Sequence, residues 1–280
     1  MRIRFERTWI RIACLVIAFF IANGVGNTAP EGPRIADSAP KLSPVPTSRD
    51  SIGSLKGVPI AIPSGYIFFG AEYEGEDQWS GKRVKGAITY DTPIQSISLR
   101  VHLPDVAPLT AQNEATWQQF LKMSREESDW IIVAVEARQF DVSGAGWVQG
   151  FVARHREGQN TDPAGWHYER QGEKRFGLTT ESLVGGRDRA KHWISDRDLL
   201  YDADGWRVVM LCDAHGSRPS LMCMQFFPIP EINAYVNVHY HITRLKDWSD
   251  MQNQLTGLIK QFVASGRAAA AQPRRGAVPE

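Results

Sequence analysis

The sequence predicts an α+β domain, in which a mostly antiparallel β-sheet carries a long C-terminal amphipathic helix and a shorter helix. Two patterns support this fold class. Residues 234–242 alternate like a half-buried strand, and large apolar residues recur at helical spacing over residues 248–263. The composition, 42% hydrophobic and 22% charged, is that of a folded globular protein. It excludes wholesale disorder, a fibrous protein and a multispanning membrane protein.

The strands are expected to be short and separated by turns rich in glycine and proline. The segment 143–146 is predicted to turn the chain into a strand over 147–152 as a hairpin, and Asp202 to Gly205 form a second turn. In chain order, the strands span residues 58–62, 66–69, 94–101, 130–135, 147–152, 206–212, 221–227 and 234–242.

Two helices are expected, both on one face of the sheet. The shorter one lies near residues 113–124, where Trp117, Phe120 and Leu121 fall at helical spacing. The longer one follows Asp247, a good N-cap residue, and its apolar stripe continues to Val263.

The N-terminus has the pattern of a secretory signal peptide. Four arginines precede an unbroken apolar run over residues 12–22, which is too short to span a bilayer as a helix. Small residues at Ala22 and Gly24 suit cleavage after Gly24. The alternative is an uncleaved membrane anchor. Cys14 lies at the start of the apolar run, so it is not a lipoprotein cysteine.

Composition divides the rest of the chain. Residues 25–56 are rich in proline, serine and glycine and are expected to form a flexible linker. Residues 57–264 are expected to form a single globular domain, and residues 265–280 a disordered tail. Lys and Arg number 32 against 31 for Asp and Glu, and the N-terminal segment holds four of the arginines. The exported part is therefore slightly acidic, which argues against a nucleic-acid partner.

Cys212 and Cys223 are predicted to form a disulfide. Each lies in a strand-like segment, and the turn between them contains Gly216 and Pro219. A hairpin would place the two cysteines opposite each other, and an oxidising compartment would close the bridge. The alternative is a pair of buried thiols in a reducing cytoplasm.

No motif identifies a reaction, and no cofactor is expected. His239 and His241 have a spacing that can present two imidazoles to one metal, but a metal site needs a third ligand, which the sequence does not place. We therefore expect both histidines on a solvated strand face with Asn237 and Thr243, and no metal. The acidic turn at Asp202 lacks the flanking residues of a calcium loop, and Gly-x-Ser-x-Gly, Gly-x-Gly-x-x-Gly and P-loop patterns are absent.

The nine tryptophans separate into two groups. Trp117, Trp130 and Trp248 belong to apolar faces and are expected in the core. Three others, Trp79, Trp166 and Trp193, have polar and charged neighbours, which is the composition of protein-binding hot spots. The candidate partner-binding residues, chosen by expected exposure, are Trp79, Trp166, Trp193, His239 and His241.

The C-terminal half resembles a known group of proteins. Its features are Leu211-Cys212, then Cys223-Met-Gln-Phe, Val236-x-Val-x-Tyr240 and Leu245-x-Asp-Trp248, and last a helix ending in Leu258-Ile-Lys-Gln-Phe262. With the export signal and Pro59 to Tyr66, this resembles small envelope proteins of Gram-negative bacteria, some of which are immunity proteins against type VI secretion phospholipase (lipase) effectors. The resemblance covers residues 194–263 and rests on fold-determining positions. It implies a periplasmic protein that occludes a toxin.

The leading hypothesis is therefore a non-enzymatic periplasmic protein that neutralises a secreted lipase by binding it. The alternatives are a cell-envelope hydrolase whose site is assembled from scattered residues, and an accessory subunit of an envelope complex, tethered to the inner membrane by an uncleaved N-terminus.

Overall fold

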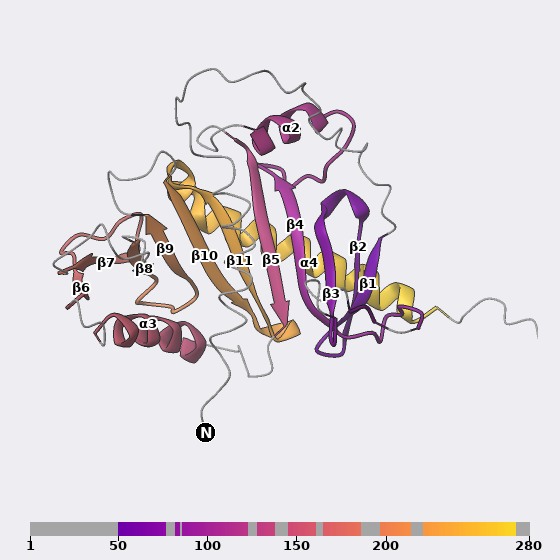
Figure 1. The fold of residues 1–280 in the computed structure, drawn as a ribbon, viewed down its shortest axis with the longest axis horizontal. Coiled ribbons are helices and arrows are strands. Elements are labelled where there is room, and N and C mark those ends of the chain that lie inside the picture. Colours follow the sequence, from indigo (N-terminus) through magenta and orange to yellow (C-terminus); the bar gives the residue numbers. More distant parts are fainter. Residues whose placement is uncertain are drawn as a thin grey trace, which may run out of the picture. The chain divides into compact units, whose positions relative to one another are not determined.

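A computed structural model describes residues 50–76, 82–84, 86–122, 128–137, 145–160, 165–185, 197–213 and 221–272. The predicted signal segment and most of the predicted linker lie outside these residues. All described elements belong to one compact unit (Figure 1). The strands are β1 (Ser51–Leu55), β2 (Val58–Ile62), β3 (Ile67–Tyr73), β4 (Ile94–His102), β5 (Trp130–Ala137), β6 (His167–Arg170), β7 (Thr179–Val184), β8 (Arg197–Tyr201), β9 (Val209–Asp213), β10 (Met222–Ile229) and β11 (Ala234–His241). The α-helices are α2 (Glu114–Lys122), α3 (Ala145–Asn160) and α4 (Trp248–Ala270), and the 3-10 helices are η1 (Ser64–Tyr66), η3 (Pro230–Ile232) and η4 (Ile242–Asp247).

The predicted α+β class is confirmed. The described strands form a nine-stranded sheet in the order β3-β4-β5-β11-β10-β9-β8-β7-β6, with every pair antiparallel, and a separate β1–β2 hairpin. Helix α4 crosses one face of this sheet, and the main hydrophobic core lies between them (Figure 1). The helix buries its apolar stripe there: Met251, Leu255, Leu258, Ile259, Phe262 and Val263.

The sequence predicts that both helices lie on one face of the sheet, and this prediction is wrong. Trp117 of α2 packs against Trp130, with ring centroids 5.1 Å apart, and Trp130 faces away from the α4 side of β5. Trp147 of α3 stacks on Tyr235, which lies on that same second face of β11. Helix α4 therefore covers one face, and α2 and α3 pack on the other.

The predicted strand over residues 147–152 is wrong, because these residues lie in α3. Trp147, Val148, Phe151 and Val152 are all buried. Their spacing places them on one side of a helix, whereas a strand would have pointed Trp147 and Val148 to opposite faces.

Two predicted domain boundaries also need correction. The composition places residues 51–55 in the linker, but they form β1 and pair with β2. The composition places residues 265–270 in the tail, but they belong to α4, and Gly266 packs against the backbone of Ile60. Asp247 does occupy the N-cap position of α4, although its side chain makes no capping hydrogen bond.

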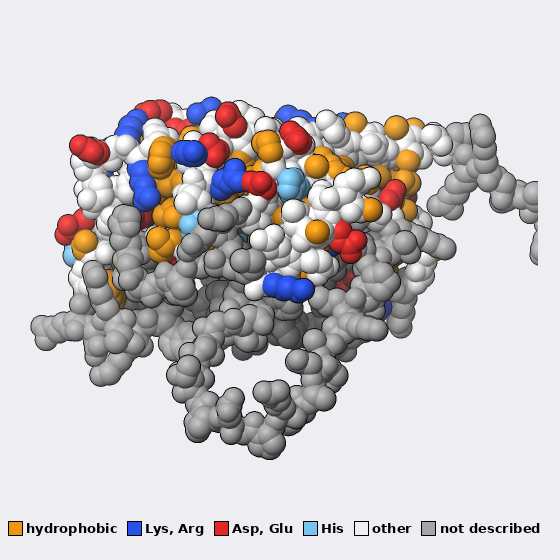
Figure 2. Space-filling view, turned by 90° about the horizontal axis from the view of Figure 1, so that it is seen from above, with side chains coloured by type: hydrophobic (Ala, Val, Ile, Leu, Met, Phe, Trp, Pro, Cys, Tyr) orange, Lys and Arg blue, Asp and Glu red, His pale blue; other side chains and the backbone are white. Residues whose placement is uncertain are grey.

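The described surface carries both signs of charge. Figure 2 shows Lys and Arg side chains interspersed with Asp and Glu over the face that it presents. On the described part of this face, such a surface gives a polyanion no continuous basic patch. Among the described residues, no helix is both long enough and apolar enough to cross a membrane.

Candidate functional site

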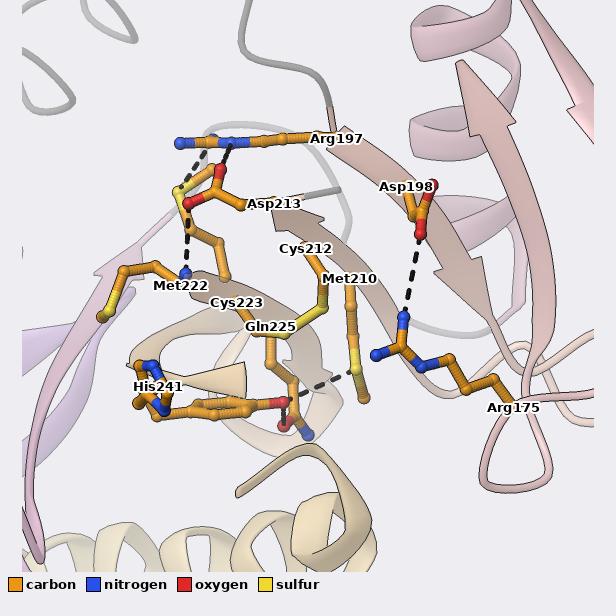
Figure 3. Close-up of a disulfide and its surroundings, with 12 residues drawn as sticks. Arg175, Arg197, Asp198, Met210, Cys212, Asp213, Met222, Cys223, Gln225 and His241 are labelled. Carbon is orange, nitrogen blue, oxygen red and sulfur yellow. Dashed lines mark hydrogen bonds and ion pairs between the residues drawn. A yellow bond between two sulfur atoms is a disulfide. The ribbon is translucent and has the colours of Figure 1, made fainter. Parts of the chain in front are cut away.

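The disulfide lies where the sequence predicts it. Strands β9 and β10 pair in a register that sets Cys212 opposite Cys223, and the two sulfurs are bonded. Both residues are fully buried on the α4 side of the sheet (Figure 3). Beside them the hydroxyl of Tyr240 donates to Oε1 of Gln225 at 3.0 Å. The bridge therefore belongs to the core and ties two neighbouring strands together.

The opposite face of the same strands carries an ion pair. Nε of Arg197 donates to Oδ1 of Asp213 at 3.1 Å, and the Met222 amide donates to Oδ2 at 3.1 Å. Nη1 of Arg197 also lies 3.5 Å from Sδ of Met224. The Asp213 carboxylate of β9 thus links its own strand to β8 and to β10.

Two methionines and two histidines share this second face. In the β10–β11 pairing Met222 stands opposite His241, and Met224 stands opposite His239. Directly opposed residues on antiparallel strands point to the same side of the sheet. Cys223 and Tyr240 alternate with them and point into the core.

The solvated polar face predicted for β11 is only partly present. His239 is half-buried, but His241 and Asn237 are buried. The neighbouring Tyr235 is covered by the Trp147 ring of α3, at a centroid distance of 5.3 Å. Nδ1 of His241 lies 2.9 Å from Oγ1 of Thr243, which fixes the orientation of the imidazole ring.

A buried polar cluster holds α3 on the sheet. Arg156 pairs with Glu181 of β7, and its Nη2 donates to the hydroxyl of Tyr201 at 2.8 Å. The Tyr201 hydroxyl donates in turn to Oε1 of Glu181 at 2.8 Å. Burial raises the pKa of Glu181, but the hydrogen bonds from Arg156 and Tyr201 outweigh it and hold that pKa below its ordinary value. Both carboxylate oxygens are engaged, so this cluster acts as a clamp between helix and sheet.

A two-residue turn at residues 175–178 exposes an aromatic ring. The amides and carbonyls of Arg175 and Leu178 bond reciprocally at 2.9 and 3.0 Å. Phe176 and Gly177 between them have positive φ values of 52° and 83°, as in a type I′ turn. Phe176 is 52% exposed, more than any other exposed large hydrophobic residue of the described chain. We call this segment, residues 174–178, the Phe176 turn.

Three contacts from other elements hold the Phe176 turn. Nε1 of Trp248, at the start of α4, donates to the carbonyl of Phe176 at 3.0 Å. Arg175 pairs with Asp198 of β8 at 3.7 Å (Figure 3), and Lys174 pairs with Asp204 at 2.9 Å. Asp204 lies in the turn predicted at residues 202–205, which Oδ1 of Asp202 closes by accepting from the amides of Asp204 and Gly205.

The predicted partner-binding tryptophans have different outcomes. Trp79 and Trp193 lie outside the described residues. Trp166 was chosen for expected exposure, and that expectation is wrong, because it is buried. Trp117 and Trp130 are buried as predicted, and Trp248 is half-buried. Sequence reasoning missed Phe176, whose available signal was a Phe-Gly pair between two polar, strand-forming segments.

The comparisons with known proteins give two likenesses of fold. No protein-family model matches the sequence, and a search of curated proteins finds no significant match. Smlt3025, an immunity protein of the Stenotrophomonas maltophilia type IV secretion system, is similar with a TM-score of 0.47 and 15% identity, over 76% of this chain and 93% of that one. FrpD, an iron-regulated outer membrane lipoprotein of Neisseria meningitidis, is similar with a TM-score of 0.40 and 13% identity, over 77% and 93%.

Proposed function

We propose that this chain is an exported periplasmic immunity protein, which neutralises a type VI secretion lipase effector by binding it directly. The signal-like N-terminus and the buried Cys212–Cys223 bridge support a location in an oxidising compartment. The resemblance of residues 194–263 to immunity proteins supports the toxin partner. Binding through surface complementarity requires an anchor residue, and the Phe176 turn supplies one.

The single observation that carries the proposal is the exposure of Phe176 on a turn that is already fixed. Aromatic anchors dominate protein interfaces because they bury a large apolar area and lose little conformational entropy on binding. The Trp248 hydrogen bond and the two ion pairs hold the turn before any partner arrives. The entropy cost of docking is therefore small.

The backbone of Phe176 strengthens this interpretation. A bulky residue with positive φ costs about 1–2 kcal/mol, whereas asparagine or glycine would occupy the same position with little strain. The exposed ring recovers little of that cost within the chain. We infer that the ring is kept for a contact with another molecule. Because Lys174 and Arg175 are paired with aspartates, the ring suits an apolar, uncharged pocket on the partner.

The test takes a secreted lipase effector, which is to be sought among the genes beside the one for this chain. The effector is directed to the periplasm of a test bacterium, with and without this protein, and survival is counted. Purified proteins then give a Kd by calorimetry. The proposal requires rescue of survival and a stable complex, and equal killing in both strains would overturn it.

The variant Phe176→Asn separates an anchor from a structural residue. Asparagine is favoured in this turn, so the variant is expected to be at least as heat-stable as the wild type. Loss of the ring should weaken the complex about 30-fold, the size of a hot-spot effect of about 2 kcal/mol. Phe69→Thr, at a 46% exposed phenylalanine of β3, is the matched control and should leave the Kd unchanged. If Phe176→Asn binds as tightly as the wild type, Phe176 is not the anchor.

A further inference from the structure

The nine-stranded sheet ends at β3 on one side and at β6 on the other (Figure 1), and the two end strands differ. Strand β3 has two shifts of register against β4, and the hydroxyl of Tyr73 ties it to β1 by donating to the carbonyl of Ile52. Such irregular edges resist pairing with another chain. Strand β6 pairs with β7 in an unbroken register and contains no proline. Among the described strands its single neighbour is β7, so β6 is the edge that a further strand can extend.

The hydrogen bonds of the β6–β7 pair show which backbone groups point outward. The amide of Gln171 donates to the carbonyl of Thr180 at 2.9 Å, in continuation of the β6–β7 register. Along an antiparallel pair, opposed residues alternate between hydrogen-bonded and non-hydrogen-bonded positions. Glu169 is therefore bonded to β7, whereas the N–H and C=O groups of Tyr168 and Arg170 point away from it. Among the described residues, no other element bonds to these outward groups.

We propose that the outer edge of β6 receives an extended strand of the effector, which adds one strand to the sheet. This inference rests on the proposed function, and it names the element of the partner that docks beside Phe176. An added strand gains main-chain hydrogen bonds along the edge, and its alternate side chains give specificity. Each of two residues in an antiparallel incoming strand can exchange a pair of hydrogen bonds, one with Tyr168 and the other with Arg170.

The edge of β6 is continuous with the Phe176 turn. Strand β6 leads into the turn and β7 leaves it, so one hairpin carries both the open edge and the exposed ring. A second copy of this chain is a weaker occupant, because two strands of four residues bury too little surface for a specific interface of about 1,200 Å² or more. An effector strand that also covers the Phe176 ring makes a larger interface.

The side chains of β6 define the chemistry of the incoming strand. On one face, Oε1 of Glu169 is already paired with Nε2 of His167 at 3.1 Å. Arg170 points to the other face and is exposed. Glu181 of β7 stands opposite Arg170, but its carboxylate is bonded to Arg156. Because opposite charges on neighbouring strands attract, we expect an acidic side chain of the effector opposite Arg170 and none opposite Glu169.

Amide exchange of the free chain tests whether the edge is open. In the isotope-labelled full chain, the amides of Tyr168 and Arg170 should exchange with heavy water at least about tenfold faster than those of Glu169 and Gln171, which bond to β7. If all four amides exchange equally slowly at every protein concentration, the edge is covered and the inference is overturned. Slowing that increases with protein concentration would assign the edge to a second copy, which also overturns it.

The same measurement is then repeated with the secreted lipase effector of the survival test. In the complex, exchange at Tyr168 and Arg170 should slow at least about tenfold, while the amides of Glu169 and Gln171 change little. A stable complex in which the two outward amides exchange as before overturns the assignment of β6 and leaves the proposed function standing. Failure to form any complex overturns both.

The variants Arg170→Pro and Arg170→Ala give a matched comparison. Both remove the guanidinium, but proline also removes the outward N–H. That N–H does not bond to β7, and proline is tolerated where the N–H of an edge strand faces solvent, so the two variants should have similar Tm values. The Kd for the effector should be about fivefold weaker for Arg170→Pro, the effect of one lost hydrogen bond. Equal Kd values would contradict the inference. If Arg170→Pro melts lower than Arg170→Ala, the exchange measurement decides, because it uses the unmodified chain.

Discussion

The contact between the end of α4 and the β1–β2 hairpin can be tested with two glycines of the same helix. A Cβ built at Gly266 would lie 2.6 Å from the carbonyl carbon of Ile60 and closer still to its Cα. A Cβ at Gly257 would meet nothing within 4 Å. Gly266→Ala and Gly257→Ala therefore make the same chemical change in a closed and an open environment.

The two substitutions should have opposite effects on the free energy of unfolding. Replacing glycine by alanine inside a helix stabilises it by up to about 1 kcal/mol, which is the whole effect expected at Gly257. At Gly266 the new methyl group meets backbone atoms, which cannot rotate away. Overpacking of this kind costs about 1–3 kcal/mol or more. If overpacking costs about 3 kcal/mol and the alanine gains about 1 kcal/mol in helix propensity, the free energy of unfolding of Gly266→Ala should fall by about 2 kcal/mol.

Urea unfolding and thermal melts measure this difference. For a domain of this size, each 1 kcal/mol shifts the Tm by about 2–4 °C, so the two variants should lie on opposite sides of the wild type. The reasoning is refuted if Gly266→Ala is as stable as Gly257→Ala. In that case residues 265–270 would not be docked on the hairpin.

Two further predictions concern stability. Replacing Cys212 and Cys223 by alanine should lower the free energy of unfolding by about 3 kcal/mol, because the bridge closes a short loop of 11 residues' separation; unchanged urea midpoints would contradict this. Burial lowers the pKa of His155 to about 4, so the folded chain holds this imidazole neutral while the unfolded chain protonates it near pH 6.5. Stability from this group is complete above pH 6.5 and falls by up to about 1.4 kcal/mol per pH unit down to pH 4. His155→Phe can still stack on Phe151 and should flatten this decline in urea titrations between pH 6.5 and 4. If the variant loses stability as steeply as the wild type, His155 is not the cause of the decline.

The features predicted correctly have local signals. The strands of the cysteine hairpin are short, apolar and separated by one turn, so Cys212 and Cys223 could be paired from the sequence alone. The α4 stripe repeats over several turns and cannot be mistaken for a strand. Apolar residues at positions 147, 148, 151 and 152 are too few to separate a helix from a buried strand, and α3 was missed for that reason.

The features predicted wrongly depend on distant contacts. The sequence pattern of β11 predicts a solvated polar face. In the structure, however, Tyr235 on that face is covered by Trp147, which comes almost 90 residues earlier in the chain. The exposure of Phe176 depends on a turn geometry that its sequence does not favour. The methionine and histidine residues were all visible in the sequence. Their meeting required the β10–β11 register, which places Met222 opposite His241.

The position of β5 in the sheet has a consequence for how the chain folds. It lies between β4, which precedes it closely, and β11, which follows roughly 100 residues later, so the centre of the sheet has a high contact order. Until residues 234–241 are available, one edge of β5 has no native partner and can pair with other chains. A chain interrupted before β11 is therefore expected to aggregate. During synthesis, chaperones are expected to shield β5 until β11 has been made.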